Sequence, residues 1–63
     1  MTEERKEILL HMKLKNYATD EEKPILWEEY EKVFGPWYGS RDCLDCIRDA
    51  IKNLYVHIIS NEL

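Results

Sequence analysis

The sequence predicts an all-α fold, a three-helix bundle in which the C-terminal helix is the longest. Apolar residues recur at intervals of three and four along much of the chain, which is the period of an amphipathic helix. The alternation of apolar and polar residues that is typical of β-strands is absent. Residues that start and end helices divide the sequence into three segments, so we expect helices at about 3–16, 24–34 and 41–60.

A length of 63 residues indicates a single domain spanning 1–63. A chain this short buries only about 60% of the surface that its unfolded form exposes, so its core is small. The composition, 44% hydrophobic and 35% charged, is that of a folded domain. No apolar run approaches the roughly 20 residues of a membrane span, and the first residues do not resemble a signal peptide. We therefore expect a cytoplasmic protein without a membrane partner, in the host cytoplasm if it is viral.

The first helix is expected to begin after Thr2, because a threonine hydroxyl can accept a hydrogen bond from the first turn. Its apolar residues cover a wide arc, as expected of a helix that packs against two others. They are Ile8, Leu9, Leu10, Met12, Leu14 and Tyr17.

The start of the second helix has two interpretations. Thr19 and Glu22 fit a capping box, which places the start near Asp20. Pro24 is favourable in the first turn of a helix and unfavourable further in, which places the start at Pro24 instead. We favour Pro24. The Gly-Pro pair at 35–36 should end this helix, with the glycine in a left-handed cap.

The third helix is expected to be capped by Ser40 and to carry the main apolar seam of the fold. The seam residues are Leu44, Ile47, Ile51, Leu54 and Ile58. Val56 and Ile59 fall outside this seam, further round the helix than a three-helix core requires. Exposed apolar residues of this kind mark partner surfaces, here including a homodimer contact. The alternative is that both are isolated surface residues.

Six aromatic residues lie from the second helix onwards: Trp27, Tyr30, Phe34, Trp37, Tyr38 and Tyr55. Most are expected to pack between the second and third helices. Trp37 and Tyr38 lie in the connecting turn, so we expect them to protrude and to anchor a protein interface. Stacking on single-stranded nucleic acid is the alternative use of such residues.

Acidic residues outnumber basic ones by six to two in the segment 20–32, and the chain has a formal net charge of −4. The simplest interpretation is a solvated helix face, and the alternative is docking to a basic partner protein through Glu28 and Glu29. Nucleic acid is disfavoured as a partner, because binding to phosphate needs a basic face and the basic cluster here is only Lys13 and Lys15.

Cys43 and Cys46 form a Cys-x-x-Cys motif with three interpretations. A structural zinc site needs four ligands. His11 is the candidate third ligand, because His57 lies about 16 Å from Cys46 along a continuous helix. A redox pair at a helix start is the second interpretation, although the neighbouring aspartates oppose a thiolate. The third, which we favour, is that the cysteines are free and pack as small hydrophobic residues.

No nucleophile and base can be paired from the sequence, and a chain of this size has little room for a pocket. We therefore predict no catalytic residues, no cofactor and no enzymatic activity.

Tyr30, the Phe-Gly pair at 34–35 and the motif Cys-x-x-Cys-Ile-Arg at 43–48, followed by an apolar helix, resemble short uncharacterised proteins of phages and mobile elements of Bacteroidetes type. The resemblance covers roughly residues 27–58. It implies no chemistry, but it favours a small phage-encoded factor that acts through contacts with a host or viral protein.

The sequence therefore predicts a small protein-interaction or assembly module. A zinc module built on the cysteine pair and a nucleic-acid-associated factor are the alternatives. The expected partner-binding residues are Trp37, Tyr38, Glu28, Glu29, Val56 and Ile59.

Overall fold

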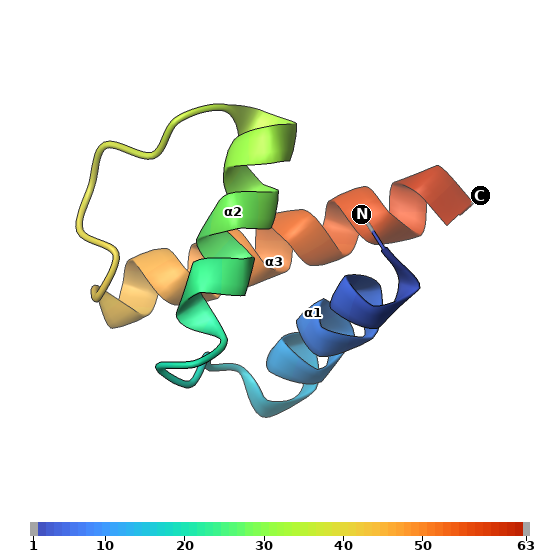
Figure 1. Ribbon diagram of the computed structural model, residues 1–63, viewed down its shortest axis with the longest axis horizontal. Coiled ribbons are helices and arrows are strands. Elements are labelled where there is room, and N and C mark those ends of the chain that lie inside the picture. The colour runs from blue at the N-terminus through green and yellow to red at the C-terminus, as the bar shows by residue number, and fades with distance from the viewer. Residues whose placement is uncertain (1, 63) are drawn as a thin grey trace.

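The computed structural model describes residues 2–62, which form three helices and no strand (Figure 1). Helix α1 spans Glu3–Lys15, α2 spans Lys23–Phe34 and α3 spans Leu44–Glu62. The 19-residue α3 runs across the centre of the molecule and packs against both other helices, which contact each other far less. Helix α1 crosses the C-terminal half of α3 obliquely and runs in broadly the opposite direction, and α2 crosses α3 steeply (Figure 1). The prediction of an all-α fold with a longest third helix is confirmed.

Helix α1 is closed at both ends by the groups expected from the sequence. The Thr2 hydroxyl accepts a hydrogen bond from the backbone N–H of Arg5 at 3.2 Å, so Thr2 is the predicted cap. Glu3 and Glu4 occupy the first turn, where the partial positive charge of the helix stabilises carboxylates. Asn16 takes the left-handed conformation, with φ of 61°, and ends the helix one residue earlier than expected.

The start of α2 combines features of both interpretations. Thr19 and Glu22 form the capping box, with the Thr19 N–H 3.0 Å from a Glu22 carboxylate oxygen and the Glu22 N–H 3.3 Å from the Thr19 hydroxyl. This box closes a separate turn, so the start at Asp20 is wrong. The helix begins at Lys23 and places Pro24 in its first turn, where the missing N–H has no partner to lose.

Glu22 also joins this turn to the end of α1, because Lys15 Nζ lies 2.6 Å from Glu22 Oε1. Desolvation raises the pKa of Glu22, but hydrogen bonds from Lys15 and Thr19 outweigh it, and the net pKa lies below its ordinary value. The carboxylate form of Glu22 is therefore favoured by the fold.

The other end of α2 stops at Gly35, whose N–H donates to the Glu31 carbonyl at 3.0 Å. Its φ of 94° requires glycine, but its ψ of −177° is not that of the predicted left-handed cap. The chain leaves α2 in an extended direction because the following proline excludes a further turn.

The start of α3 differs from the prediction, since the helix begins at Leu44 rather than at 41. Ser40 does not cap it, because its hydroxyl accepts from the Asp42 N–H at 3.2 Å and so supports a turn before the helix. The capping atom is a sulfur: the Cys46 N–H donates to Cys43 Sγ at 3.4 Å. The predicted helix was too long at its start because a serine is a more common cap than a cysteine.

The core lies where α1 and α2 meet α3. Its buried residues are Leu9, Met12, Ala18, Leu26, Trp27, Ile47, Ala50, Ile51, Leu54 and Ile58. Four of the five predicted seam residues are among them, but Leu44 is 66% exposed because it opens the helix beyond the reach of α1 and α2. Ala50 replaces it in the core. In α1, Leu14 is 83% exposed, so the predicted apolar arc is too wide.

An aromatic cluster packs the link between α2 and α3, residues 35–43, against the core. The rings of Trp27 and Trp37 are stacked with centroids 4.9 Å apart, and Tyr30 meets both at 5.6 Å. The Trp27 indole N–H donates to the Arg41 carbonyl at 3.3 Å. Trp37 therefore does not protrude as predicted, whereas Tyr38 does, with 92% of its side chain exposed. Stacking on a large buried ring removes Trp37 from water, which its place in a turn does not reveal.

Candidate functional site

One face of α3 carries a stripe of basic and apolar side chains beside α1. Arg48, Lys52, Tyr55 and Ile59 follow one another at intervals of four, three and four, so they lie in one row along the helix. Lys13 of α1 lies over the Tyr55 ring, with Nζ 5.3 Å from the ring centroid. This contact identifies the row as the flank of α3 that is turned towards α1.

Leucines of α1 extend this flank outwards. Leu10 is three residues before Lys13, and Leu14 is four residues after Leu10, so the three share one side of α1. The Lys13–Tyr55 contact places this side of α1 beside the row of α3 that holds Tyr55 and Ile59. Apolar side chains of both helices therefore flank the Lys13–Tyr55 contact.

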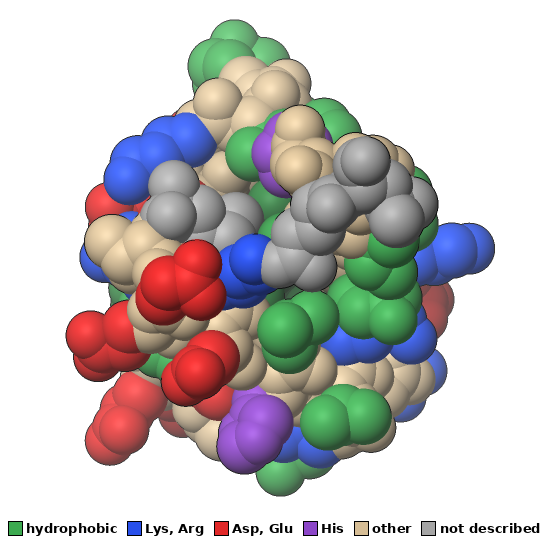
Figure 2. Space-filling model, turned by 90° about the vertical axis from the view of Figure 1, so that its right-hand side faces the viewer, with side chains coloured by type: hydrophobic (Ala, Val, Ile, Leu, Met, Phe, Trp, Pro, Cys, Tyr) green, Lys and Arg blue, Asp and Glu red, His purple; other side chains and the backbone are tan. Residues whose placement is uncertain are grey.

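We call this region the α1–α3 surface and define it by Leu10, Leu14, Tyr55, Val56 and Ile59. Val56 lies three residues before Ile59 and is 53% exposed, and Leu14 is the most exposed member of the set. Figure 2 views the molecule from the end where α1 begins and α3 ends. It shows apolar side chains gathered on one half of this face and acidic side chains on the other.

Cations border the α1–α3 surface. Within residues 2–62, Lys13, Arg48 and Lys52 make no ion pair, whereas the acids of α2 are engaged with other basic residues. These three cations are thus not neutralised by ion pairs, although the chain as a whole has a net charge of −4 and the row of α3 that holds Val56 also carries Asp45 and Asp49. Long basic side chains can cover apolar area with their stems while the charged ends stay in water.

Glu28 and Glu29, the acidic residues predicted to dock a partner, form ion pairs within the chain. Arg5 Nη1 lies 2.9 Å from Glu28 Oε1 and 3.0 Å from Glu29 Oε1, and Lys32 lies within 3.6 Å of both. Glu29 is buried, with 2% of its side chain exposed, so it does not lie on the surface at all. The hydrogen bond from Arg5 lowers the pKa of Glu28. These ion pairs connect α1 to α2.

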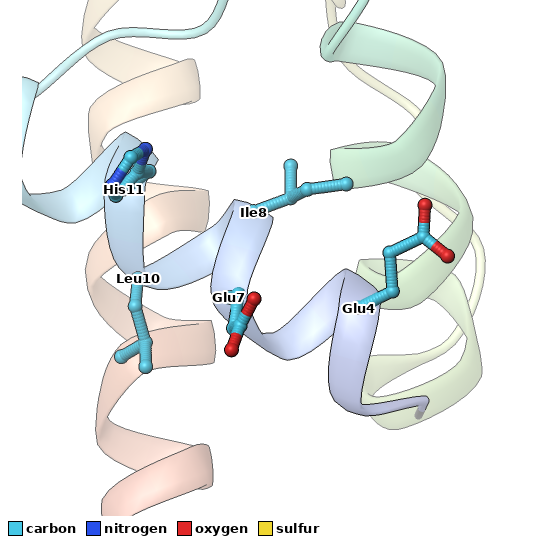
Figure 3. Close-up of a pocket in the computed structure, with 5 residues that line it drawn as sticks. All are labelled: Glu4, Glu7, Ile8, Leu10 and His11. Atoms are coloured by element: carbon cyan, nitrogen blue, oxygen red, sulfur yellow. The ribbon is translucent and has the colours of Figure 1, made fainter.

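A shallow groove of about 410 Å³ runs along the outer side of α1 (Figure 3). It is lined by Glu4, Glu7, Ile8, Leu10 and His11. Figure 3 shows Glu4 and Ile8 directed towards α2, and Leu10 directed to the other side, where α3 lies. The groove therefore ends at the edge of the α1–α3 surface, and Leu10 belongs to both.

The candidate zinc ligands are not assembled. Over residues 2–62, no group of three His, Cys, Asp or Glu side chains is placed to hold a metal ion. His11 lines the groove on α1. His57 lies against Phe34, with ring centroids 6.3 Å apart. The cysteine pair thus has no third ligand among these residues.

Cys43 and Cys46 are free thiols that are each partly exposed at the start of α3. Hydrogen bonds from the Cys46 thiol and the Cys46 N–H lower the pKa of Cys43. The same contact with Cys43 raises the pKa of Cys46, and burial raises it further. The two thiols therefore differ in acidity, and both are free and only partly buried.

The predicted partner-binding residues do not form one surface. Trp37 and Tyr38 lie in the link before α3, whereas Val56 and Ile59 lie near its other end (Figure 1). The sequence pattern identified Val56 and Ile59 as binding residues. It did not identify the leucines of α1 or the nearby cations, which are Leu10, Leu14, Lys13, Arg48 and Lys52. Helical periodicity places Leu14 on the side of α1 opposite the buried Leu9 and Met12, so its exposure could have been predicted. The prediction of a wide buried arc on α1 assigned Leu14 to the core instead.

The sequence matches no family model and no curated protein, and the structure matches no solved structure. None of the helices in residues 2–62 is long and apolar enough to cross a membrane.

Proposed function

We propose that the protein is a protein-interaction module that binds its partner through the α1–α3 surface. The observation that carries this proposal is the set of exposed apolar side chains on two helices that pack together, with Leu14 83%, Val56 53% and Ile59 37% exposed. Contiguous exposed apolar side chains are typical of interaction sites in small proteins. Burial of the exposed parts of such side chains contributes about 1–2 kcal/mol each to binding.

The partner of this surface is a protein segment with apolar anchors and acidic flanks, such as an amphipathic helix. The unpaired Lys13, Arg48 and Lys52 support this chemistry, because opposite charges around an apolar centre give orientation and a fast encounter. A symmetric dimer through this surface would bring the unpaired cations of both copies to one interface, which is unfavourable. A different protein is therefore the better occupant. The resemblance to phage and mobile-element proteins supports a host or viral protein in this role.

Photo-crosslinking from single positions tests the proposal. The photoreactive phenylalanine analogue p-benzoylphenylalanine replaces Val56 in one variant and Tyr38 in a matched control, since Tyr38 is exposed at the far end of the molecule. Each purified variant is irradiated alone and in lysate of the organism that encodes the chain. The expected result is a discrete protein adduct from position 56 that is absent from position 38. Adding Lys52→Glu should abolish the adduct while the helical circular dichroism signal is retained.

Three results would contradict the proposal. An adduct from position 38 alone moves the contact to the link between α2 and α3. Adducts of twice the chain mass in the purified sample identify a second copy as the occupant. A salt-sensitive gel shift with RNA or DNA that Lys52→Glu removes would assign the surface to nucleic acid.

A further inference from the structure

We propose that Cys43 and Cys46 form a redox-active dithiol that exchanges with disulfides, in which Cys43 attacks the substrate and Cys46 resolves the mixed disulfide. The proposal concerns the start of α3 and is independent of the α1–α3 surface. Two features of the geometry carry it: the position of the two sulfurs relative to the helix, and their access to solvent.

The backbone brings the two cysteines to a distance that a disulfide can span. Residues three apart in the first turn of a helix have Cα atoms about 5 Å apart, inside the range of about 4.4–6.8 Å for a disulfide. The Cys46 N–H points at Cys43 Sγ, at 3.4 Å, so the Cys43 sulfur already lies over the first turn. Closing the bond therefore needs side-chain rotation and no rearrangement of α3.

The position of Cys43 also supports a nucleophilic role. Its sulfur occupies the cap of a 19-residue helix and accepts a backbone N–H, which is the environment that favours a thiolate. The lowered pKa of Cys43 and the raised pKa of Cys46 agree with this division of roles, and the charges of Asp45 and Asp49 act on Cys46 in the same direction. The aspartate charge at 45 opposes the thiolate of Cys43, but hydrogen bonding outweighs it.

The substrate can reach the pair. Residues 39–42 and 44–45 on either side of Cys43 are exposed, and both cysteines are partly exposed themselves. A groove of about 340 Å³ is lined by Asp42, the residue before Cys43, together with Trp27 and the Lys23 side chain. A disulfide-bearing molecule can therefore approach Cys43 from solvent.

The exchange balances as follows. The Cys43 thiolate attacks one sulfur of a disulfide RSSR, its S–S bond breaks, and one RS⁻ leaves and takes up the proton lost by Cys43. Cys46 then loses its proton and attacks Cys43 Sγ, which releases the second RS⁻, protonated in turn. The products are a Cys43–Cys46 disulfide and two RSH, and two electrons have passed from the protein to the disulfide. Two thiols drive the reverse reaction.

The test uses the full chain, reduced and then equilibrated in mixtures of glutathione and glutathione disulfide. Mass spectrometry after alkylation is expected to show a single species that has lost two hydrogens and carries no glutathione. Cys46→Ser should stop at a glutathione adduct on Cys43. Cys43→Ser keeps a good helix cap, and its remaining Cys46 should react with iodoacetamide at neutral pH at least about twofold more slowly than Cys43 does in Cys46→Ser, because only Cys43 lies at the helix cap. Circular dichroism of both variants checks that α3 is intact.

Glutathione bound to both cysteines without a bridging disulfide, or equal alkylation rates in the two variants, would overturn the proposal. A second arm distinguishes the substrates. Reduction of insulin disulfides by dithiothreitol is measured with the wild-type chain and with Cys43→Ser. Acceleration by the wild type alone assigns protein disulfides as substrates, and equal rates together with glutathione exchange assign small disulfides.

Discussion

Replacement of Trp27 by phenylalanine should remove a large part of the stability of this protein. Trp27 is the largest fully buried side chain and is 1% exposed. Its ring contacts Tyr30 and Trp37, and its indole N–H donates a hydrogen bond to the Arg41 carbonyl at 3.3 Å. Phenylalanine keeps an aromatic ring in the core but loses the hydrogen bond, part of the stacking area and the volume of the second ring.

The cost can be worked from these three losses. The hydrogen bond contributes about 1 kcal/mol. The missing apolar area, roughly 40 Å², contributes about 1 kcal/mol at 25 cal/mol per Å². The reduced stacking contributes roughly 0.5 kcal/mol. The expected loss of about 2–3 kcal/mol compares with a total stability of about 3–9 kcal/mol for a domain of this length. The melting temperature should fall by about 10–20 °C.

Trp37→Phe is the matched control, because it makes the same chemical change in a partly exposed ring. Its indole N–H donates to the Ser40 carbonyl at 3.2 Å in an exposed turn, where water can replace it. This variant should lose less than about 1 kcal/mol. Thermal unfolding followed by circular dichroism at 222 nm measures both, independently of tryptophan emission. Equal losses in the two variants, or a fall of only a few degrees for Trp27→Phe, would refute the assignment of Trp27 as the centre of the core.

Three further outcomes follow from the same structure. Thr2→Ala should cost about 1 kcal/mol in thermal unfolding through loss of the α1 cap, and Thr2→Ser should restore it. Leu54→Ala should cost about 2–5 kcal/mol because Leu54 is fully buried, whereas Leu14→Ala should change stability by less than about 0.5 kcal/mol; similar costs would contradict the burial pattern. The pKa of Glu22 is lowered on folding, so its pairing with Lys15 stabilises the fold above the ordinary carboxyl pKa of about 4.3, and this stability is lost as the pH falls through the lowered value. Urea unfolding of Glu22→Gln should therefore lose less stability than the wild type between about pH 6 and about pH 3, and parallel curves would exclude the linkage.

The helices were predictable because local signals mark most of their ends. Thr2, the Thr19–Glu22 box and Gly35 each satisfy backbone groups within a few residues, and such contacts depend on sequence distance alone. The start of α3 was missed because Ser40 and Cys43 both can cap a helix. The choice between them depends on where Trp27 holds Arg41, a contact between residues 14 apart.

The candidate site was predictable only in part, for a similar reason. Periodicity showed that Val56 and Ile59 lie off the seam of α3, and both are exposed. It did not show that α1 packs beside this part of α3, where Lys13 lies over the Tyr55 ring. Glu29 was assigned to the surface because its neighbours are acidic, whereas an arginine from another helix compensates its burial. Contacts between helices decide these positions, and a single sequence does not contain them explicitly.

The central place of α3 has a consequence for folding. Helices α1 and α2 have few contacts with each other, and their apolar sides are covered by α3, which follows them in the chain. Isolated helices of 12 or 13 residues are marginal in water. Residues 1–43 alone should therefore stay unfolded, and the chain should fold in one step once α3 is free to pack. A purified chain truncated before Ile51 should be fully sensitive to protease, because it lacks most of the helix around which the others pack.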